Sequence, residues 1–431
     1  MTMFIRTIAI LVLSGSAVLS EWSSIGLGET YCEGVQIHDD RYYVATQNGI
    51  RTRDVADDGG EWTSIGLDNS YILDFIVFSS QEIMASKFLR NDLDPSDTIS
   101  IFRTTDGGVT WKPYQNGFGG PNAVYYGHAT CTHLEHDPAN PDTLYARGPY
   151  VAAKSYDRGQ SWTVIYPDKG DDQDAWGRIG YQSTIMGIDD YVPGRIWVGG
   201  EASLFQGYLA KSLDYGETWV TYSQNDFFEQ NPGDNACYTV VPNPTNPQAL
   251  LLGMEGYIFK SPDEGETWTL SHESPTYAYI IDIENSPTTE NRIYATGSDN
   301  GTGGGDLFFL VSNDFGETWE KVSWSEGPGG LAVTDLTILK VEDRDFLICA
   351  TDEGLFTYAE PSTATGRLQK PARINRTTDP QVRVFGAAGD RHENLERGHL
   401  IYDLTGKRVT SSERKQRSVT GVYVAVPRQS R

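Results

Sequence analysis

Short apolar runs alternate with turns rich in glycine, proline and aspartate through most of the chain. Residues 238–241, 250–254 and 257–260 are three such runs, with polar turn residues between them. Runs of this length suit strands, whereas an amphipathic helix shows its periodicity over about ten residues or more. The pattern therefore predicts an all-β protein built from short antiparallel strands.

An eight-residue motif, which we call the aspartate turn, recurs along the chain. It has Ser or Thr at its first position, Asp at the third, Gly at the fifth and Trp at the eighth. Successive Trp positions from Trp62 to Trp319 differ by 49, 51, 57, 49 and 51 residues. A degenerate copy ends at Trp62, and five complete copies contain Asp106, Gly108 and Trp111; Asp157, Gly159 and Trp162; Asp214, Gly216 and Trp219; Asp263, Gly265 and Trp268; and Asp314, Gly316 and Trp319.

The chemistry of the aspartate turn is that of a tight chain reversal. An Asp side chain accepts hydrogen bonds from backbone N–H groups just after it, and Gly supplies the positive φ that closes the turn. The Trp then begins a new strand, where its indole covers an apolar face between repeat units. Four short strands at a period near fifty residues predict one blade of a β-propeller.

Counting these units gives seven blades, of which the last is incomplete. Strands are expected at residues 333–341, 346–351 and 354–358, and no Trp-led fourth strand follows them. Residues 21–27 repeat residues 61–67 with one Ser in place of Thr. We therefore predict a seven-bladed β-propeller over residues 21–360, in which the N-terminal strand completes the last blade and leaves no blade unpaired.

The aspartate turn resembles the signature of the Asp-box (BNR) repeat family, Ser/Thr-x-Asp-x-Gly-x-Thr-Trp, over residues 21–360. Relatives include sialidases, xyloglucan-degrading glycosidases, sortilin-type receptors and a photosystem-assembly factor. The resemblance implies that the motif is a structural turn at the outer rim, away from any active site. It indicates the fold and leaves the chemistry open.

The first twenty residues are typical of a secretory signal. Arg6 precedes an apolar stretch at residues 8–13, and small residues lie before Glu21, where we place the cleavage. The apolar stretch is too short to span a bilayer, which favours a removed signal over a membrane anchor. No later run reaches the roughly 18 apolar residues of a spanning helix. We expect a protein that is secreted or held at the outer cell surface.

The C-terminal part has a different character. Residues 361–380 lack apolar periodicity and are predicted to be a linker. Residues 381–431 are predicted to form a small β-sandwich with strands at 381–385, 399–404, 407–410 and 421–426. The string at residues 400–409 and the later one at 421–424 resemble the C-terminal sorting domain of the type IX secretion system. The resemblance implies export by that machinery; a generic immunoglobulin-like appendage is the alternative.

Charge is divided between the two parts. The formal net charge is −25, yet residues 366–431 hold 14 Lys and Arg against 6 Asp and Glu, a net of +8, which leaves −33 on the first 365 residues. So acidic a body argues against binding nucleic acid, whose phosphates reward Lys and Arg. The four cysteines lie about a hundred residues apart, outside any metal-ligand spacing, and are expected to be small buried side chains rather than disulfides.

Propeller ligands normally bind at one mouth of the central channel, and the loops expected there carry aromatic residues beside polar ones. Aromatic rings pack on the C–H faces of sugars, while carboxylates accept from their hydroxyls. The same rings could equally fill space between blades. The predicted ligand-binding residues are Tyr125, His128, Asp174, Trp176, Arg178 and Tyr181.

Three inner-strand carboxylates, Asp74, Asp282 and Asp335, are candidates for glycoside hydrolysis, which needs a pair of carboxyl groups. The structural alternative is that they accept hydrogen bonds from amides of neighbouring blades. The Phe/Tyr-Arg-Ile-Pro string of sialidases is absent, and the xyloglucan enzymes use two propellers where this chain has length for one. We expect no metal, because His133 and His136 would point to opposite faces of a strand, and no cofactor, because no phosphate-binding glycine loop occurs.

The leading hypothesis from sequence is a monomeric, exported propeller that binds glycan or protein ligands at its channel mouth without catalysis. A glycoside hydrolase that uses the channel carboxylates is the rival hypothesis. A purely structural domain of a cell-surface assembly is the third.

Overall fold

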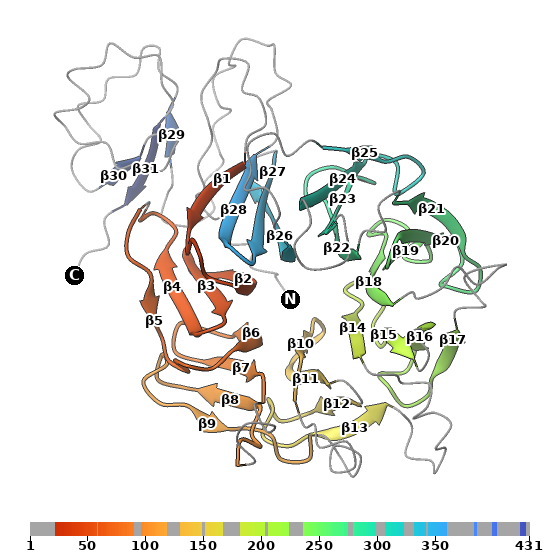
Figure 1. Cartoon of the computed structure of the whole chain (residues 1–431), viewed down its shortest axis with the longest axis horizontal. Helices are drawn as coiled ribbons and strands as arrows, with labels where there is room; N and C mark the ends of the chain where they lie inside the picture. Colours follow the sequence, from red (N-terminus) through yellow and green to blue (C-terminus); the bar gives the residue numbers. More distant parts are fainter. Residues whose placement is uncertain are drawn as a thin grey trace.

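Seven four-stranded antiparallel sheets stand around a central axis in the computed structural model (Figure 1). The structure describes residues 22–57, 59–89, 96–118, 130–148, 151–166, 182–202, 206–223, 236–274, 279–298, 307–322, 332–341, 344–359, 383–385, 399–402 and 423–427. Within these ranges the secondary structure is all β, and none of the residues forms a helix that could cross a membrane. The predicted seven-bladed propeller is confirmed.

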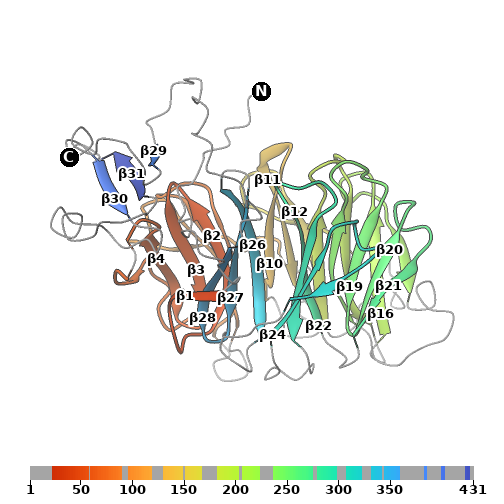
Figure 2. The ribbon, with the colours of Figure 1, turned by 90° about the horizontal axis from the view of Figure 1, so that it is seen from above.

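Each blade runs from an inner strand at the channel to an outer strand at the rim (Figures 1 and 2). Blades 1 to 4, in chain order, consist of β2 (Cys32–His38), β3 (Arg41–Thr46), β4 (Gly49–Asp54) and β5 (Thr63–Ser64); β6 (Ile72–Val77), β7 (Ile83–Lys87), β8 (Ile101–Thr104) and β9 (Lys112–Pro113); β10 (His133–Asp137), β11 (Asn140–Gly148), β12 (Val151–Ser155) and β13 (Thr163–Tyr166); and β14 (Gln182–Ile188), β15 (Ile196–Ala202), β16 (Gln206–Ser212) and β17 (Val220–Ser223).

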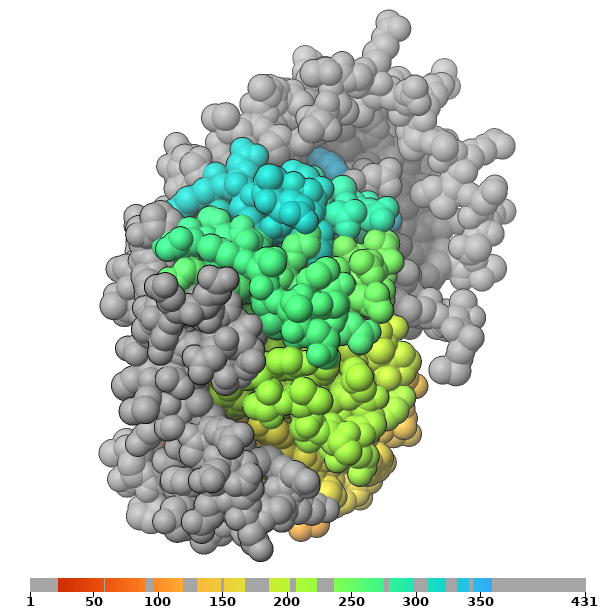
Figure 3. Space-filling model, turned by 90° about the vertical axis from the view of Figure 1, so that its right-hand side faces the viewer, coloured from red at the N-terminus to blue at the C-terminus, as the bar shows by residue number. Residues whose placement is uncertain are grey.

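The remaining blades follow the same order, and in Figure 3 the yellow-green, green and cyan segments of successive blades lie next to one another. Blades 5 to 7 consist of β18 (Cys237–Pro242), β19 (Leu250–Met254), β20 (Tyr257–Ser261) and β21 (Thr269–Glu273); β22 (Tyr279–Asn285), β23 (Ile293–Ser298), β24 (Leu307–Ser312) and β25 (Glu320–Lys321); and β26 (Val333–Val341), β27 (Arg344–Thr351), β28 (Gly354–Ala359) and β1 (Trp22–Gly26).

The N-terminal strand β1 completes blade 7, as predicted. Its antiparallel register against β28 pairs Trp22 with Tyr358 and Ser24 with Phe356. The Trp22 ring meets Phe309 of blade 6 edge-on, with the centroids 5.5 Å apart. The two ends of the propeller therefore close the ring through a shared sheet, in which β28 is paired on both sides.

The aspartate turn has one hydrogen-bond pattern in all five complete copies. In blade 5, Ser261 Oγ donates to Asp263 Oδ1 at 2.9 Å and accepts from the Gly265 N–H at 2.8 Å. Thr267 donates its N–H to Asp263 Oδ1 and its hydroxyl to Oδ2, at 2.8 and 2.7 Å. The equivalent bonds recur in the other copies. The carboxylate therefore faces its own turn.

Apolar side chains gather between blades rather than within them. The described residues contain seven buried clusters, one at each of the seven blade interfaces. Trp162, which is 5 % exposed, packs between blades 2 and 3 and donates its indole N–H to Tyr114 O at 2.8 Å. Trp219 reaches back to Ile165 O in the same way. The repeated indoles thus join each blade to the one before it.

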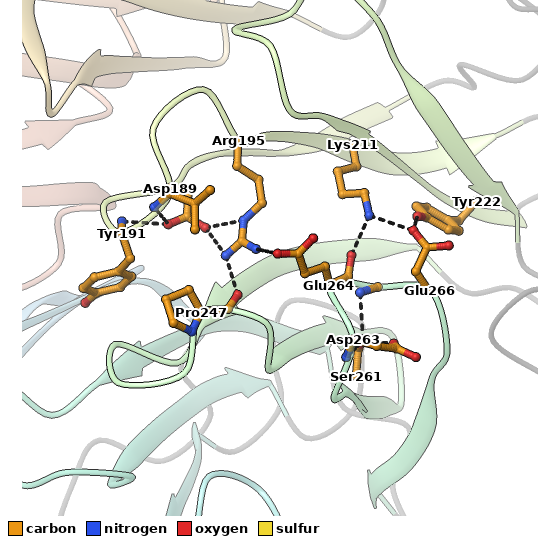
Figure 4. Close-up of polar contacts among 12 residues, drawn as sticks. Asp189, Tyr191, Arg195, Lys211, Tyr222, Pro247, Ser261, Asp263, Glu264 and Glu266 are labelled. Atoms are coloured by element: carbon orange, nitrogen blue, oxygen red, sulfur yellow. Dashed lines mark hydrogen bonds and ion pairs between the residues drawn. The ribbon is translucent and has the colours of Figure 1, made fainter.

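Buried cations join blades in the opposite direction. Lys211, whose side chain is 3 % exposed, extends from blade 4 to Glu264 O and Glu266 Oε1 of blade 5, at 2.8 and 3.0 Å (Figure 4). Arg195, fully buried beside it, donates to Asp189 within blade 4 and to Pro247 O of blade 5. Lys211 directly precedes the Ser of an aspartate turn, and Arg103 and Lys154 at the same position also reach the next blade.

The cysteines and the C-terminal strands complete the description. Cys32, Cys131, Cys237 and Cys349 are all buried and free, as predicted. In the C-terminal part, β29 (Arg383–Phe385), β31 (Tyr423–Pro427) and β30 (His399–Tyr402) form an antiparallel sheet in that order. The predicted signal peptide, the linker and the strand at residues 407–410 lie outside the described residues.

Candidate functional site

The three candidate carboxylates lie on innermost strands and connect neighbouring blades. Asp335 Oδ2 accepts from the Val35 N–H at 2.9 Å, which joins blade 7 to blade 1. Asp282 Oδ2 accepts from the Leu336 N–H at 3.1 Å, which joins blade 6 to blade 7. Both carboxylates therefore accept a hydrogen bond from an amide of the neighbouring blade, which is the structural alternative to catalysis given in the sequence analysis.

Asp74 makes the corresponding contact from blade 2 to blade 3. Its Oδ2 accepts from the Leu134 N–H at 2.7 Å and lies 2.9 Å from Nδ1 of His133. A register shift precedes each of the three aspartates, where one extra residue enters the inner strand. A bulge of this kind re-aims the following side chain, and here it turns each carboxylate toward the adjacent blade.

These channel groups influence one another electrostatically. Burial raises the pKa of Asp282 to about 6, and burial with repulsion from Asp282 raises the pKa of Asp335 to about 7. Burial and the same two carboxylates raise the pKa of Glu284. Burial opposes the charging of His133, but the Asp74 carboxylate outweighs it and the pKa of His133 is raised. The channel wall therefore holds acids that titrate near neutral pH.

His133 and His136 do not converge on one point with other ligands. His133 faces Asp74, whereas His136 Nδ1 lies 3.3 Å from Glu135 Oε1. Among the described residues, no three His, Cys, Asp or Glu side chains are arranged to hold a metal ion.

A second feature lies on the mouth face, which carries the loops entering the inner strands and the turns between the second and third strands of each blade. Antiparallel order puts the aspartate turns on the opposite face, the turn face. Between blades 1 and 2 the mouth face has a hollow of about 520 Å³, which we call the mouth groove. Its lining residues are Tyr31, Gln47, Asn48, Asn69 and Tyr71.

Hydrogen bonds fix the polar side of the mouth groove. In the turn between β3 and β4, Thr46 Oγ1 donates to Gly49 O and accepts from the Asn48 N–H, at 2.8 and 3.0 Å. Asn48 Oδ1 accepts from the Asn69 N–H at 2.6 Å, so the loops of two blades are joined. A Cβ on Gly49, whose φ is +86°, would come within 2.7 Å of Gly66 O. This close approach holds the exposed amides of Gln47 and Asn48 at the groove.

Two tyrosines form the aromatic side. The rings of Tyr31 and Tyr71 meet edge to face, with centroids 5.8 Å apart and planes at 77°. The Tyr71 hydroxyl donates to Glu33 Oε1. Burial raises the pKa of Tyr31 to about 12 and that of Glu33 to about 7, with Asp74 contributing to the latter. The phenols are therefore neutral donors, and Glu33 titrates near physiological pH.

A smaller hollow of about 410 Å³ lies on the other side of the same two blades. It is lined by Arg41, Tyr43, Thr52, Ile65, Ser80, Gln81, Asp106 and Gly107. Because Asp106 belongs to an aspartate turn and is held by Thr104 and Thr110, this hollow is part of the scaffold on the turn face.

The ligand residues predicted from sequence belong to other loops. Tyr125, His128, Asp174, Trp176, Arg178 and Tyr181 lie outside the described residues. The mouth groove was not predicted, although a signal exists: Tyr31 and Tyr71 each stand directly before the first buried residue of an inner strand, Cys32 and Ile72.

Comparison with known proteins defines the class of fold. No protein-family model matches the chain, and no curated protein matches its sequence. Among solved structures, YCF48 bound to a D1 peptide has a TM-score of 0.52 and 14% identity, covering 81% of this chain and 99% of that one. The GH74 xyloglucanase from Xanthomonas campestris has a TM-score of 0.55 and 16% identity, covering 79% and 53%.

A third similar structure is an extracellular domain. The extracellular domain of the one-component system BT4673 from B. thetaiotaomicron has a TM-score of 0.52 and 12% identity, covering 78% of this chain and 39% of that one. This chain thus spans about half or less of the xyloglucanase and of the BT4673 extracellular domain. Proteins with such different names share this fold, so function must be argued from the site.

Proposed function

We propose that this protein is a non-catalytic, ligand-binding β-propeller whose mouth face binds a glycan or protein ligand. One observation carries the proposal: the mouth groove presents two tyrosine rings and the exposed amide side chains of Gln47, Asn48 and Asn69. Asn48 accepts a hydrogen bond through its side-chain oxygen, and its NH₂ group remains a possible donor to a ligand. A concave site with aromatic walls and a few fixed polar groups is the usual form of a binding site.

The similar solved structures are consistent with a ligand-binding function but do not identify the ligand. YCF48 has been solved with a bound D1 peptide, the GH74 protein is a xyloglucanase, and the BT4673 structure is the extracellular domain of a one-component system. We propose that the aspartate turns make this chain an Asp-box propeller, with domains at residues 21–360 and 381–431 joined by a linker. We further propose removal of residues 1–20 and export by a type IX-like route to the cell exterior as a monomer.

The rival function is glycoside hydrolysis by Asp74, Asp282 and Asp335. The raised pKa values of Asp282 and Asp335 would suit a general acid, and the similarity to a GH74 xyloglucanase is consistent with this alternative. Each of these carboxylates, however, has an oxygen engaged by a backbone N–H of the next blade. A group that holds the ring together is poorly placed to exchange protons with a substrate, and this favours binding over hydrolysis.

The test is to screen the full chain against a glycan array, a peptide library and a panel of chromogenic glycosides. We expect retained ligands without turnover, and at least a tenfold loss of affinity in Tyr71→Ala. Tyr156→Ala, which removes an exposed tyrosine from the turn face, is the matched control and should bind normally. Turnover that disappears in Asp335→Asn and Asp282→Asn would establish the rival function instead.

A further inference from the structure

The mouth groove combines features that a neutral sugar would not use. Its two rings stand at 77° and form a corner, whereas a sugar face packs best on a single flat ring face. The Tyr71 hydroxyl donates to the Glu33 carboxylate. A phenol that donates to a carboxylate carries more electron density on its ring, which strengthens attraction for a cation above the ring.

Charge around the mouth groove has one sign. Its lining residues include no Lys or Arg among the described side chains. Two cations of the same blades are paired with carboxylates, since Arg51 lies 2.8 Å from Asp68 and Lys87 pairs with Asp97. Asp352, from the equivalent turn of blade 7, acts on Tyr31 electrostatically. With a net charge of −33 on the first 365 residues, the field draws cations toward this face and repels anions.

We propose that the mouth groove binds a basic peptide by accepting a protonated Lys or Arg side chain in the corner that the Tyr31 and Tyr71 rings form. The exposed side-chain amides of Gln47, Asn48 and Asn69 then form hydrogen bonds with the peptide backbone, because an amide group has both donors and an acceptor. This inference rests on the proposed binding function and names the class of its ligand.

Proton linkage follows from the position of Glu33. The ionisable groups that act on it are Tyr31, Cys32, Tyr71 and Asp74, and no positive group is among them. Burial is the main reason that its pKa is raised to about 7. A docked cation favours the carboxylate, so the pKa of Glu33 falls and a proton is released on binding. Affinity for the basic peptide should therefore increase from pH 6 to pH 8.

The experiment is calorimetric titration of the full chain with four blocked peptides, Gly-Gly-X-Gly-Gly, in which X is Lys, Arg, norleucine or Glu. We expect the Lys and Arg peptides to bind at least tenfold more tightly than the norleucine peptide and the Glu peptide not to bind. Titrations in two buffers of different ionisation enthalpy should report proton release near pH 7.

Variants separate the groove from the general field. Tyr71→Ala removes a ring without changing charge and should lower Lys-peptide affinity at least tenfold, while Glu33→Gln should also remove the pH dependence. Asp54→Asn removes one charge from an exposed residue that pairs with Arg41 near the turn face and should leave affinity within twofold. Thermal unfolding of each variant checks that it is folded.

Two results overturn the inference and are distinguishable. If a neutral oligosaccharide or the norleucine peptide binds as tightly as the Lys peptide, and Tyr71→Ala abolishes that binding, the ligand class is wrong while the binding function stands. If no ligand from the array, the library or the four peptides responds to Tyr31→Ala or Tyr71→Ala, both the inference and the proposed site fail.

Discussion

At the scale of single residues, the aspartate turn shows how one side chain closes a chain reversal. Asp263 accepts three hydrogen bonds from groups within its own motif, from Ser261 and Thr267. Those bonds outweigh the effect of burial, so the pKa of Asp263 is lowered. The Asp263 carboxylate is therefore engaged in hydrogen bonds within its own turn, as are the carboxylates of the other four aspartate turns.

Replacing Asp263 with Ala should therefore destabilise the propeller without affecting ligand binding. The variant leaves the Thr267 N–H without its acceptor, which corresponds to about 1–2 kcal/mol in the free energy of unfolding. Urea denaturation measures it, with Glu61→Ala, an exposed acid in the degenerate copy, as a control expected within about 0.5 kcal/mol. Equal stability of the two variants would contradict the structural role.

At the scale of elements, strand β1 takes the position of the outer strand in blade 7. It pairs with β28 through Trp22, Ser23, Ser24 and Gly26. Gly354, at the turn into β28, has a φ of +112° and lies so near the N-terminal segment that a Cβ would approach Gly26 O within 2.7 Å. The closing strand is thus fitted to its partner as closely as strands within one continuous blade.

Deleting residues 22–26 should open the ring. We expect the shortened chain to unfold at a lower temperature and to self-associate, because β28 then presents an unpaired edge. A synthetic peptide of residues 21–28 added in trans should restore the monomer, and a scrambled peptide should not. Light scattering with thermal unfolding measures both effects, and an unchanged unfolding temperature in the shortened chain would show that closure by β1 is dispensable.

At the scale of the whole molecule, the parts that repeat were predictable and the parts that occur once were not. The period of Trp62, Trp111 and their successors gives the number of blades, and the likeness of residues 21–27 to 61–67 gives the closure. The mouth groove depends on Tyr31 and Tyr71, which stand outside the repeated motif. Which blade each channel carboxylate faces depends on register shifts in the inner strands, and alternation of apolar and polar residues does not reveal these.

The channel carboxylates also make the stability of the whole ring depend on pH. Folding raises the pKa of Asp282 and Asp335 to about 6 and 7, chiefly through burial, so the folded state holds these protons more tightly than the unfolded chain. Their contribution to stability is present at low pH and is lost as pH rises from about 4, the ordinary Asp value, through 7. His133 acts in the same direction, because its raised pKa favours the folded state until pH exceeds that value.

We therefore expect the unfolding temperature to fall between pH 5 and pH 8, a range above the titration of the aspartate turns. Asp335→Asn should flatten this dependence, since an amide oxygen can still accept from the Val35 N–H while the repulsion from Asp282 disappears. At pH 8 the variant should unfold at a higher temperature than the parent protein, and at pH 5 at nearly the same temperature. Asp54→Asn removes an exposed charge and should follow the parent curve. An unfolding temperature of the parent protein that rises toward pH 8 would contradict this prediction. It would mean that the hydrogen bonds from neighbouring blades stabilise the ionised forms of Asp282 and Asp335 by more than burial destabilises them.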